Sequence, residues 1–114
     1  RIVKFMPVIQ KTVVVSNPQG LHARPAELFS RLALQFEADI EVIRDGLRID
    51  AKSILSVLTL GAAQGTALVL EARGTDAEKA VDALERLVVS DFKADDINTD
   101  NLKTDETLSQ ESSG

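Results

Sequence analysis

The 114-residue chain contains no cysteine, tryptophan or tyrosine, and it has a single histidine. The lack of cysteine excludes disulfide bonds, thiol redox chemistry and thiolate metal sites. One histidine without cysteine also argues against a zinc site, so we expect no metal and no cofactor. Four phenylalanines are the only aromatic side chains. The sequence therefore offers no aromatic platform on which nucleic-acid bases would stack.

Long apolar runs and basic stretches are missing as well. The apolar runs are short and interrupted, so we expect no membrane-inserted segment. No secretory signal sequence is visible, and the cytoplasm is the expected location. The formal net charge is −5 and no basic stripe is present, which argues against binding to the phosphates of nucleic acid.

The charge and composition divide the chain into three parts. A hydrophobic content of 44% is enough for one modest core, and we place a single domain at residues 9–91. Residues 1–8 are either a leader or an extension of the first strand. Residues 92–114 carry two lysines and six acidic residues with only isolated apolar side chains. Such a segment buries too little surface to become ordered, so we expect a flexible acidic tail.

The first half of the domain predicts a strand, a helix and a hairpin. A β-branched run at residues 10–15 predicts a strand, and the Pro and Gly of residues 16–20 predict a turn. Alternating apolar and polar residues on both sides of Asp45-Gly46 predict two antiparallel strands joined by a type I′ turn. A helix is predicted between the turn at 16–20 and this hairpin. Its polar side comprises Glu27, Ser30, Arg31 and Gln35, and its core side Ala26, Phe29, Leu32, Ala33 and Phe36.

The second half predicts two helices around a fourth strand. Ser53 has the chemistry of an N-cap and Gly61 that of a helix stop, so a short helix lies between them. Residues 66–72 predict a strand, and a capping box at 75–78 predicts the start of the last helix. Its core stripe comprises Ala77, Ala80, Val81, Leu84, Leu87 and Val88. The order is β-α-β-β-α-β-α, typical of an α+β fold.

The single histidine, His22, lies at the start of the first predicted helix, in the sequence GLHARPA at residues 20–26. A histidine changes its charge near neutral pH, so a neutral imidazole is available to attack a phosphoryl group. A helix N-terminus holds phosphate through its unpaired N–H groups, and Arg24 adds a cation that bonds phosphate oxygens. These residues indicate phosphoryl transfer through His22. The alternative is that His22 only caps the helix or packs.

The short helix carries more apolar side chains than one core-facing stripe can hold. If Val57 and Leu60 face the core, then Ile54, Leu55 and Leu58 cannot all share that side. Either the core wraps the helix on both sides, or these three form an exposed patch for a partner protein. Leu34, on the polar side of the first helix, is either an isolated exposed leucine or part of the same surface.

Ser53 has two compatible roles. Its hydroxyl can cap the short helix, and it can also be a phosphorylation site. A phosphate there would place roughly two negative charges beside the apolar patch and repel an acidic partner.

From about Gln10 to Val89 the chain resembles HPr, the phosphocarrier family of the bacterial sugar phosphotransferase system. The resemblance rests on GLHARPA at 20–26, AKSIL at 51–55 and LGAAQG at 60–65. It implies an open-faced β-sandwich in which three helices cover one face of a four-stranded antiparallel sheet. It also implies a carrier with a transient phosphohistidine rather than a stand-alone enzyme. We expect a monomer, since a carrier must exchange partners.

The resemblance further implies roles for individual residues. His22 would receive phosphate on its δ nitrogen from the phosphoenolpyruvate-dependent enzyme I and pass it to a sugar-specific enzyme IIA domain, with Arg24 steadying the phosphoryl group. Ser53 would match the site of the ATP-dependent HPr kinase (HPr kinase/phosphorylase). The implied docking face comprises Ile54, Leu55 and Leu58, with Ala23 and Leu34 at its border.

The chain departs from the family pattern at two positions. Glu27 stands where a small residue is common, and Leu34 where a basic residue is frequent. Both changes bear on docking, because enzyme I presents an acidic surface in this family. A regulatory module of a nitrogen- or carbon-control relay, acting mainly by protein–protein binding, stays open as an alternative. An enzyme with His22 as general base is disfavoured, since the motif offers no second titratable partner.

Overall fold

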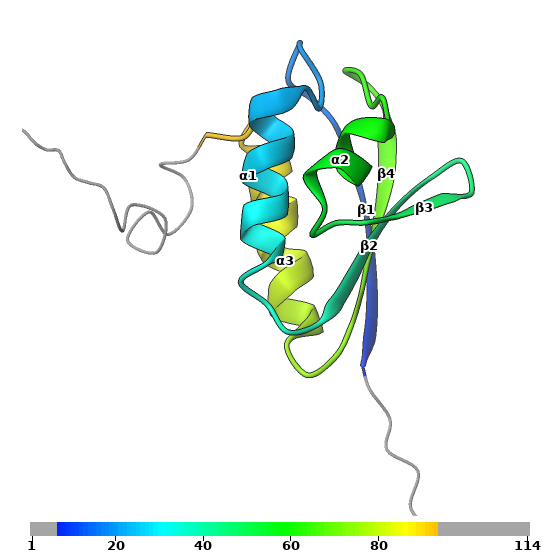
Figure 1. The fold of residues 1–114 in the computed structure, drawn as a ribbon, viewed down its shortest axis with the longest axis vertical. Helices are drawn as coiled ribbons and strands as arrows, with labels where there is room; N and C mark the ends of the chain where they lie inside the picture. The colour runs from blue at the N-terminus through cyan, green and yellow to red at the C-terminus, as the bar shows by residue number, and fades with distance from the viewer. Residues whose placement is uncertain (1–6, 94–114) are drawn as a thin grey trace, which may run out of the picture.

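The computed structural model describes residues 7–93, so residues 1–6 and most of the predicted tail, 94–114, lie outside the described part. Seven elements follow one another in the predicted order: β1 (Val8–Val14), α1 (Ala23–Ala33), β2 (Asp39–Arg44), β3 (Leu47–Asp50), α2 (Ile54–Thr59), β4 (Ala67–Arg73) and α3 (Ala77–Val89). The strands form one sheet in the order β1-β4-β2-β3, and every neighbouring pair is antiparallel. The helices lie on one side of the sheet (Figure 1). The predicted open-faced sandwich is confirmed.

The core lies between the sheet and the helices. Alternate residues of β4, namely Leu68, Leu70 and Ala72, are fully buried, as expected for the covered face of a sheet. All six residues of the predicted stripe on α3 have no exposed surface. Each large apolar side chain buried in this way contributes about 1.5–3 kcal/mol to the free energy of unfolding.

The hairpin confirms the turn that the sequence predicts. Asp45 and Gly46 have positive φ values of 51° and 84°, as a type I′ turn requires. Arg44 pairs with Leu47 across the turn. At the other end of the sheet, β1 begins at Val8, so the first strand starts two residues earlier than its β-branched run predicts.

One side of α1 was predicted incorrectly. Ser30 was expected on the polar side, yet it is fully buried, and neighbouring Leu28 is buried too. The reason is α2, which packs against α1 and covers a second side of that helix. Helical periodicity describes one apolar stripe and cannot show that a later element covers the adjacent one.

The predicted capping box at the start of α3 is also wrong. Asp76 occupies the N-cap position, but its side chain makes no capping bond to its own helix. Its carboxylate instead accepts the backbone N–H groups of Glu37 and Ala38, both at 2.9 Å. The bond from Glu37 is the main cause of a lowered pKa of Asp76. Asp76 therefore fastens the α1–β2 loop to the start of α3.

Phe92, which the composition assigned to the tail, packs into the core with 7% of its surface exposed. Its N–H donates to the carbonyl of Leu87 at 2.8 Å, and the N–H of Asp91 donates to that of Val88 at 3.1 Å. This is the Schellman arrangement, which turns the chain back over the end of a helix. Packing thus extends one residue beyond the expected domain end at residue 91.

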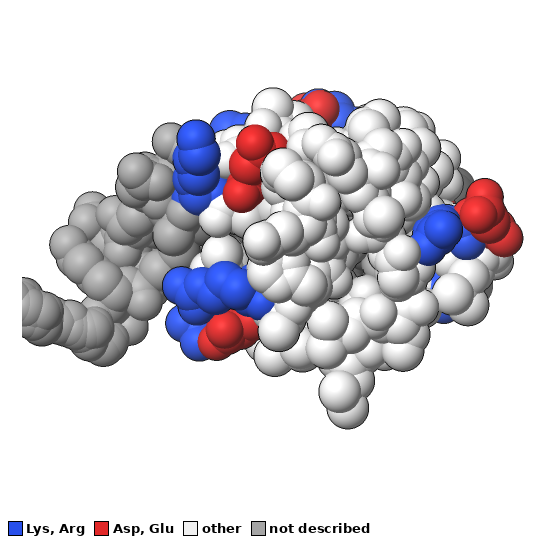
Figure 2. Space-filling view, turned by 90° about the horizontal axis from the view of Figure 1, so that it is seen from above, with Lys and Arg blue, Asp and Glu red and all other residues white. Residues whose placement is uncertain are grey.

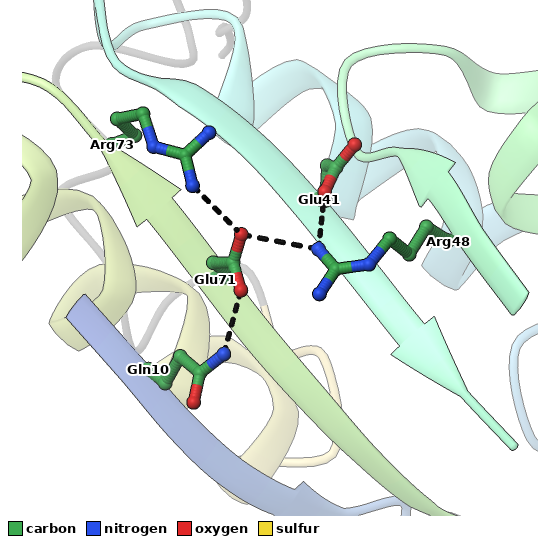
Figure 3. Close-up of polar contacts among 5 residues, drawn as sticks. All are labelled: Gln10, Glu41, Arg48, Glu71 and Arg73. Atoms are coloured by element: carbon green, nitrogen blue, oxygen red, sulfur yellow. Dashed lines mark hydrogen bonds and ion pairs between the residues drawn. The ribbon is translucent and has the colours of Figure 1, made fainter. Parts of the chain in front are cut away.

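The uncovered face of the sheet carries a polar network centred on Glu71 of β4 (Figure 3). Gln10 of β1 donates to its carboxylate at 2.6 Å, and Arg48 of β3 and Arg73 of β4 approach it at 3.1 and 3.5 Å. Arg48 also contacts Glu41 of β2 at 2.8 Å. The network therefore joins all four strands. The Gln10 bond is the main cause of a lowered Glu71 pKa, with the Arg48 bond second among the stabilising contacts.

Glu71 is expected to make the stability of the fold depend on acid pH. The pKa of Glu71 is lower in the folded chain than its ordinary value of 4.5. As the pH falls, the unfolded chain takes up this proton first, so the stabilisation is present above about pH 4.5 and is lost below it. Glu71→Gln should cost about 1–3 kcal/mol at pH 7, because the charged bonds are weakened. Urea unfolding of both proteins between pH 7 and pH 3 should show the difference shrinking below pH 4.5. A difference independent of pH would contradict this role.

None of the helices within residues 7–93 is long and apolar enough to cross a membrane.

Candidate functional site

A tight contact between two loops presents His22 at the surface. Gly20 has a φ of 69°, and a side chain there would overlap the carbonyl oxygen of Ala62 and come within 2.9 Å of the Ala63 Cα. The next N–H, that of Leu21, donates to the same Ala62 carbonyl at 2.9 Å. Only glycine combines this backbone conformation with this approach. The loop before α1 is thus held against the loop after α2.

His22 is the N-cap residue of α1, with an extended backbone and no hydrogen bond from its side chain to the helix. The first helical bond runs from the N–H of Ala26 to the His22 carbonyl at 2.9 Å. The N–H groups of Ala23 and Arg24 precede that bond, so they belong to the first turn that anions can approach. The imidazole is exposed. It therefore neither caps the helix nor packs, which rules out the structural alternative.

The imidazole borders a cleft of about 420 Å³. Asn17 is buried in its wall and donates through Nδ2 to the Gly20 carbonyl at 2.8 Å. Its Oδ1 has no hydrogen-bond partner among the described residues. Ser16 donates to the Asp91 carboxylate at 2.5 Å, which joins the end of α3 to the loop before α1. The cleft is lined by Asn17, Pro18, Gln19, His22, Arg24, Pro25, Asp91 and Phe92.

Sequence reasoning missed Asn17, Asp91 and Phe92 at this cleft. Asn17 was taken only as a turn residue, and Phe92 as part of the tail. A Schellman motif usually has glycine at the position that Asp91 occupies with a φ of 60°. The sequence therefore lacks the glycine that would have predicted this helix end. Residues 7–93 hold no cluster of three or more side chains suited to binding a metal ion.

Arg24 is directed along its own helix. Its guanidinium contacts Glu27 at 3.3 Å, and the second carboxylate oxygen of Glu27 accepts from Arg31 at 2.8 Å. The Arg24 side chain is 64% exposed and that of Glu27 is 36% exposed. Arg24 and Arg31 therefore share the carboxylate of Glu27.

The short helix α2 has the predicted cap. The Ser53 hydroxyl accepts the N–H of Ser56 at 3.2 Å, and Gly61 follows the last turn with a φ of 58°. Val57 and Leu60 are buried as predicted. Ser53 is itself half-buried. The capping role is therefore confirmed.

The apolar side chains of α2 that do not face the core are exposed. Leu55 has 76% of its surface exposed, Ile54 43% and Leu58 36%. The alternative in which the core wraps α2 on both sides is therefore wrong. Figure 2 shows the molecule from above the view of Figure 1, where residues other than Lys, Arg, Asp and Glu form a broad area with charged residues at its sides. We call Ile54, Leu55, Leu58 and Leu34 the apolar patch.

The structure brings Leu34 to the apolar patch although it comes from another helix. Leu34 follows α1 and is 62% exposed. It lines a groove of about 290 Å³ between α1 and α2 together with Ser53, Ile54 and Leu55. Ala23 is exposed at the start of α1. His22 and Ser53 line different clefts, so the two candidate phosphorylation sites are spatially separate.

Comparisons with known proteins agree on one family. The family described as the PTS HPr component phosphorylation site matches residues 9–90. The phosphocarrier protein HPr of Treponema pallidum is 41% identical over 86 residues, covering 75% of this chain and 98% of that protein. The HPr of Cupriavidus necator is 36% identical over 85 residues, which cover 75% of this chain and 96% of that protein.

Solved structures show the same similarity. HPr-C-His from Thermoanaerobacter tengcongensis has a TM-score of 0.72 at 42% identity, covering 74% of this chain and 94% of that one. The phosphocarrier protein HPr from Bacillus anthracis has a TM-score of 0.69 at 42% identity, with coverage of 71% and 96%.

Proposed function

Because the chain belongs to the HPr family of phosphocarrier proteins, we propose that His22 accepts a phosphoryl group from a phosphoenolpyruvate-dependent enzyme I and delivers it to an enzyme IIA-type domain. The observation that carries this proposal is the position of the imidazole. It is exposed at the N-cap of α1, borders a cleft and makes no capping bond that phosphorylation would break.

The chemistry requires little from the protein beyond placement and charge. The lone pair of a neutral imidazole nitrogen attacks phosphorus, and the new N–P bond forms as the bond to the donor's leaving group breaks. The leaving group keeps the electron pair of that bond. Phosphoryl transfer depends chiefly on positioning and on stabilising charge on the oxygens. The N–H groups of the first turn of α1 and the guanidinium of Arg24 are the groups of this chain suited to that task.

A carrier must also release its phosphate. The open position of His22 serves this need, since a buried and fully bonded phosphohistidine would be too stable to pass on. On delivery an acceptor attacks phosphorus from the side facing the partner, and the N–P electron pair returns to the imidazole. The apolar patch on α2 and at Leu34 supports docking of both partners, because exposed apolar patches mark protein–protein surfaces.

The direct test is to incubate the full chain with purified enzyme I and phosphoenolpyruvate. The expected product is a phosphate label that is labile in acid and stable in alkali, as an N–P bond is. Addition of an enzyme IIA domain should then discharge the label. An unlabelled chain with several sources of enzyme I would favour the regulatory module acting only by binding.

Ser53 is proposed as a second, regulatory phosphorylation site for an ATP-dependent HPr kinase. Its phosphate would stand next to Ile54 and Leu55, so the added negative charge should weaken docking of an acidic partner without unfolding α2. Ser53→Asp is therefore expected to slow transfer from enzyme I by about tenfold. The control is Thr75→Asp, which adds the same charge at an exposed residue before α3 that lines neither cleft and should leave the rate nearly unchanged. Equal rates for Ser53→Asp and the unaltered chain would count against this regulation.

A further inference from the structure

We propose that Glu27 is a positioning residue that competes with a phosphoryl group on His22 for the guanidinium of Arg24. The inference rests on the proposed phosphorylation of His22. It assigns to Glu27 a control over how strongly the phosphorylated form is stabilised.

The contacts of Glu27 are the basis of this proposal. One carboxylate oxygen contacts Arg24 at 3.3 Å and the other accepts from Arg31 at 2.8 Å. The spacings i,i+3 and i,i+4 place all three side chains on one surface of α1. Arg24 also lines the cleft of His22, whereas Glu27 and Arg31 line the groove between α1 and α2. Arg24 thus stands at the boundary between the two and can turn to either side.

The two anions cannot use the same guanidinium face at once without bringing their charges together. For Arg24 to contact a phosphoryl group on His22, it must weaken its contact with Glu27. That loss reduces the net stabilisation of the phosphorylated form. The longer 3.3 Å contact of Arg24, against 2.8 Å for Arg31, fits a side chain that can be released.

The expected size follows from the exposure of the pair. Contacts between exposed charges are weak, so release of Arg24 from Glu27 should strengthen its coupling to the phosphoryl group by about twofold to fivefold. Since a guanidinium favours the dianionic phosphoryl group, Glu27→Gln should lower the midpoint of its last ionisation by about 0.3–0.7 pH units. For the same reason, the fraction of Glu27→Gln that is phosphorylated at equilibrium, at a fixed ratio of phosphoenolpyruvate to pyruvate, should be higher than in the unaltered chain.

The test uses the full chain phosphorylated chemically with phosphoramidate, so that it does not depend on enzyme I. The ionisation of the phosphohistidine is followed by ³¹P NMR across pH in the unaltered chain and in Glu27→Gln. Glu78→Gln is the matched control, because it removes one exposed carboxylate from α3 and should leave the midpoint unchanged. The comparison is then repeated in an Arg24→Gln background, where the effect of Glu27→Gln should disappear.

The outcomes separate this inference from the proposed function. An unchanged midpoint in Glu27→Gln overturns the inference, and so does an equal shift with and without Arg24, which would indicate a direct charge effect. A shift that requires Arg24 supports it. If that shift occurs while enzyme I never labels the chain, the proposed donor is wrong and the Arg24–Glu27 competition stands.

Discussion

Replacement of His22 by alanine is expected to abolish the acid-labile label from enzyme I and phosphoenolpyruvate, with a loss of at least a thousandfold in the rate of labelling. The reason is chemical, since the chain has one histidine and no cysteine to replace it as acceptor. The side chain is exposed and makes no capping bond. The free energy of unfolding should therefore change by less than about 0.5 kcal/mol.

The measurement is the labelling time course followed by treatment with acid or alkali, alongside urea unfolding of the same samples. Gln19→Ala is a suitable control, because Gln19 is an exposed polar residue that lines the same cleft. It should keep most of the labelling rate. An acid-labile label that survives in His22→Ala would place the acceptor elsewhere and overturn the proposed function.

The second large effect is expected at the centre of the apolar patch. Leu55 is 76% exposed, so Leu55→Asp removes no core contact and should leave stability within about 0.5 kcal/mol. In a docked complex it would bury a charge against an apolar surface. A residue at the centre of an interface typically contributes about 2 kcal/mol, so transfer from enzyme I should slow by about 30-fold.

Leu47→Asp provides the matched control for this prediction. Leu47 is 50% exposed and lies beside the β2–β3 turn, outside the lining of both clefts. The same change in charge and volume there should leave the rate of phosphoryl transfer nearly unaltered. When the transfer rate is measured against the concentration of the carrier, Leu55→Asp should mainly raise the concentration that gives half the maximal rate. Equal losses in both variants would contradict a docking role for the apolar patch.

The elements that the sequence predicted most accurately are those whose signal is local. The core stripe of α3 repeats at helical spacing and is fully buried, and Asp45-Gly46 forms the turn that its two residue types favour. The cap of α2 at Ser53 is of the same kind, since its hydroxyl reaches an N–H only three residues away. Such interactions join residues close together in the chain, so the local sequence is enough to predict them.

The errors arose where a residue contacts a segment that is distant in the chain, instead of the neighbours from which its role was predicted. Residues 75–78 predict a capping box, but Asp76 takes the N-cap position and its carboxylate accepts two N–H groups from nearly forty positions earlier in the chain. Ser30 is buried on the side of α1 against which α2 packs. The competing partner in each case lies far along the chain, and no window of neighbouring residues contains it.

The sequence by itself indicated the proposed acceptor, because His22 is the single histidine of the chain and lies beside a predicted helix start. It also determined the order of the elements through periodicity and turn chemistry. Only the tertiary structure decided which side chains surround His22: Asn17 from the preceding loop and Phe92 from the end of α3 meet there. It likewise decided that Arg24 is shared with Glu27, since that depends on side-chain geometry and not on residue type alone.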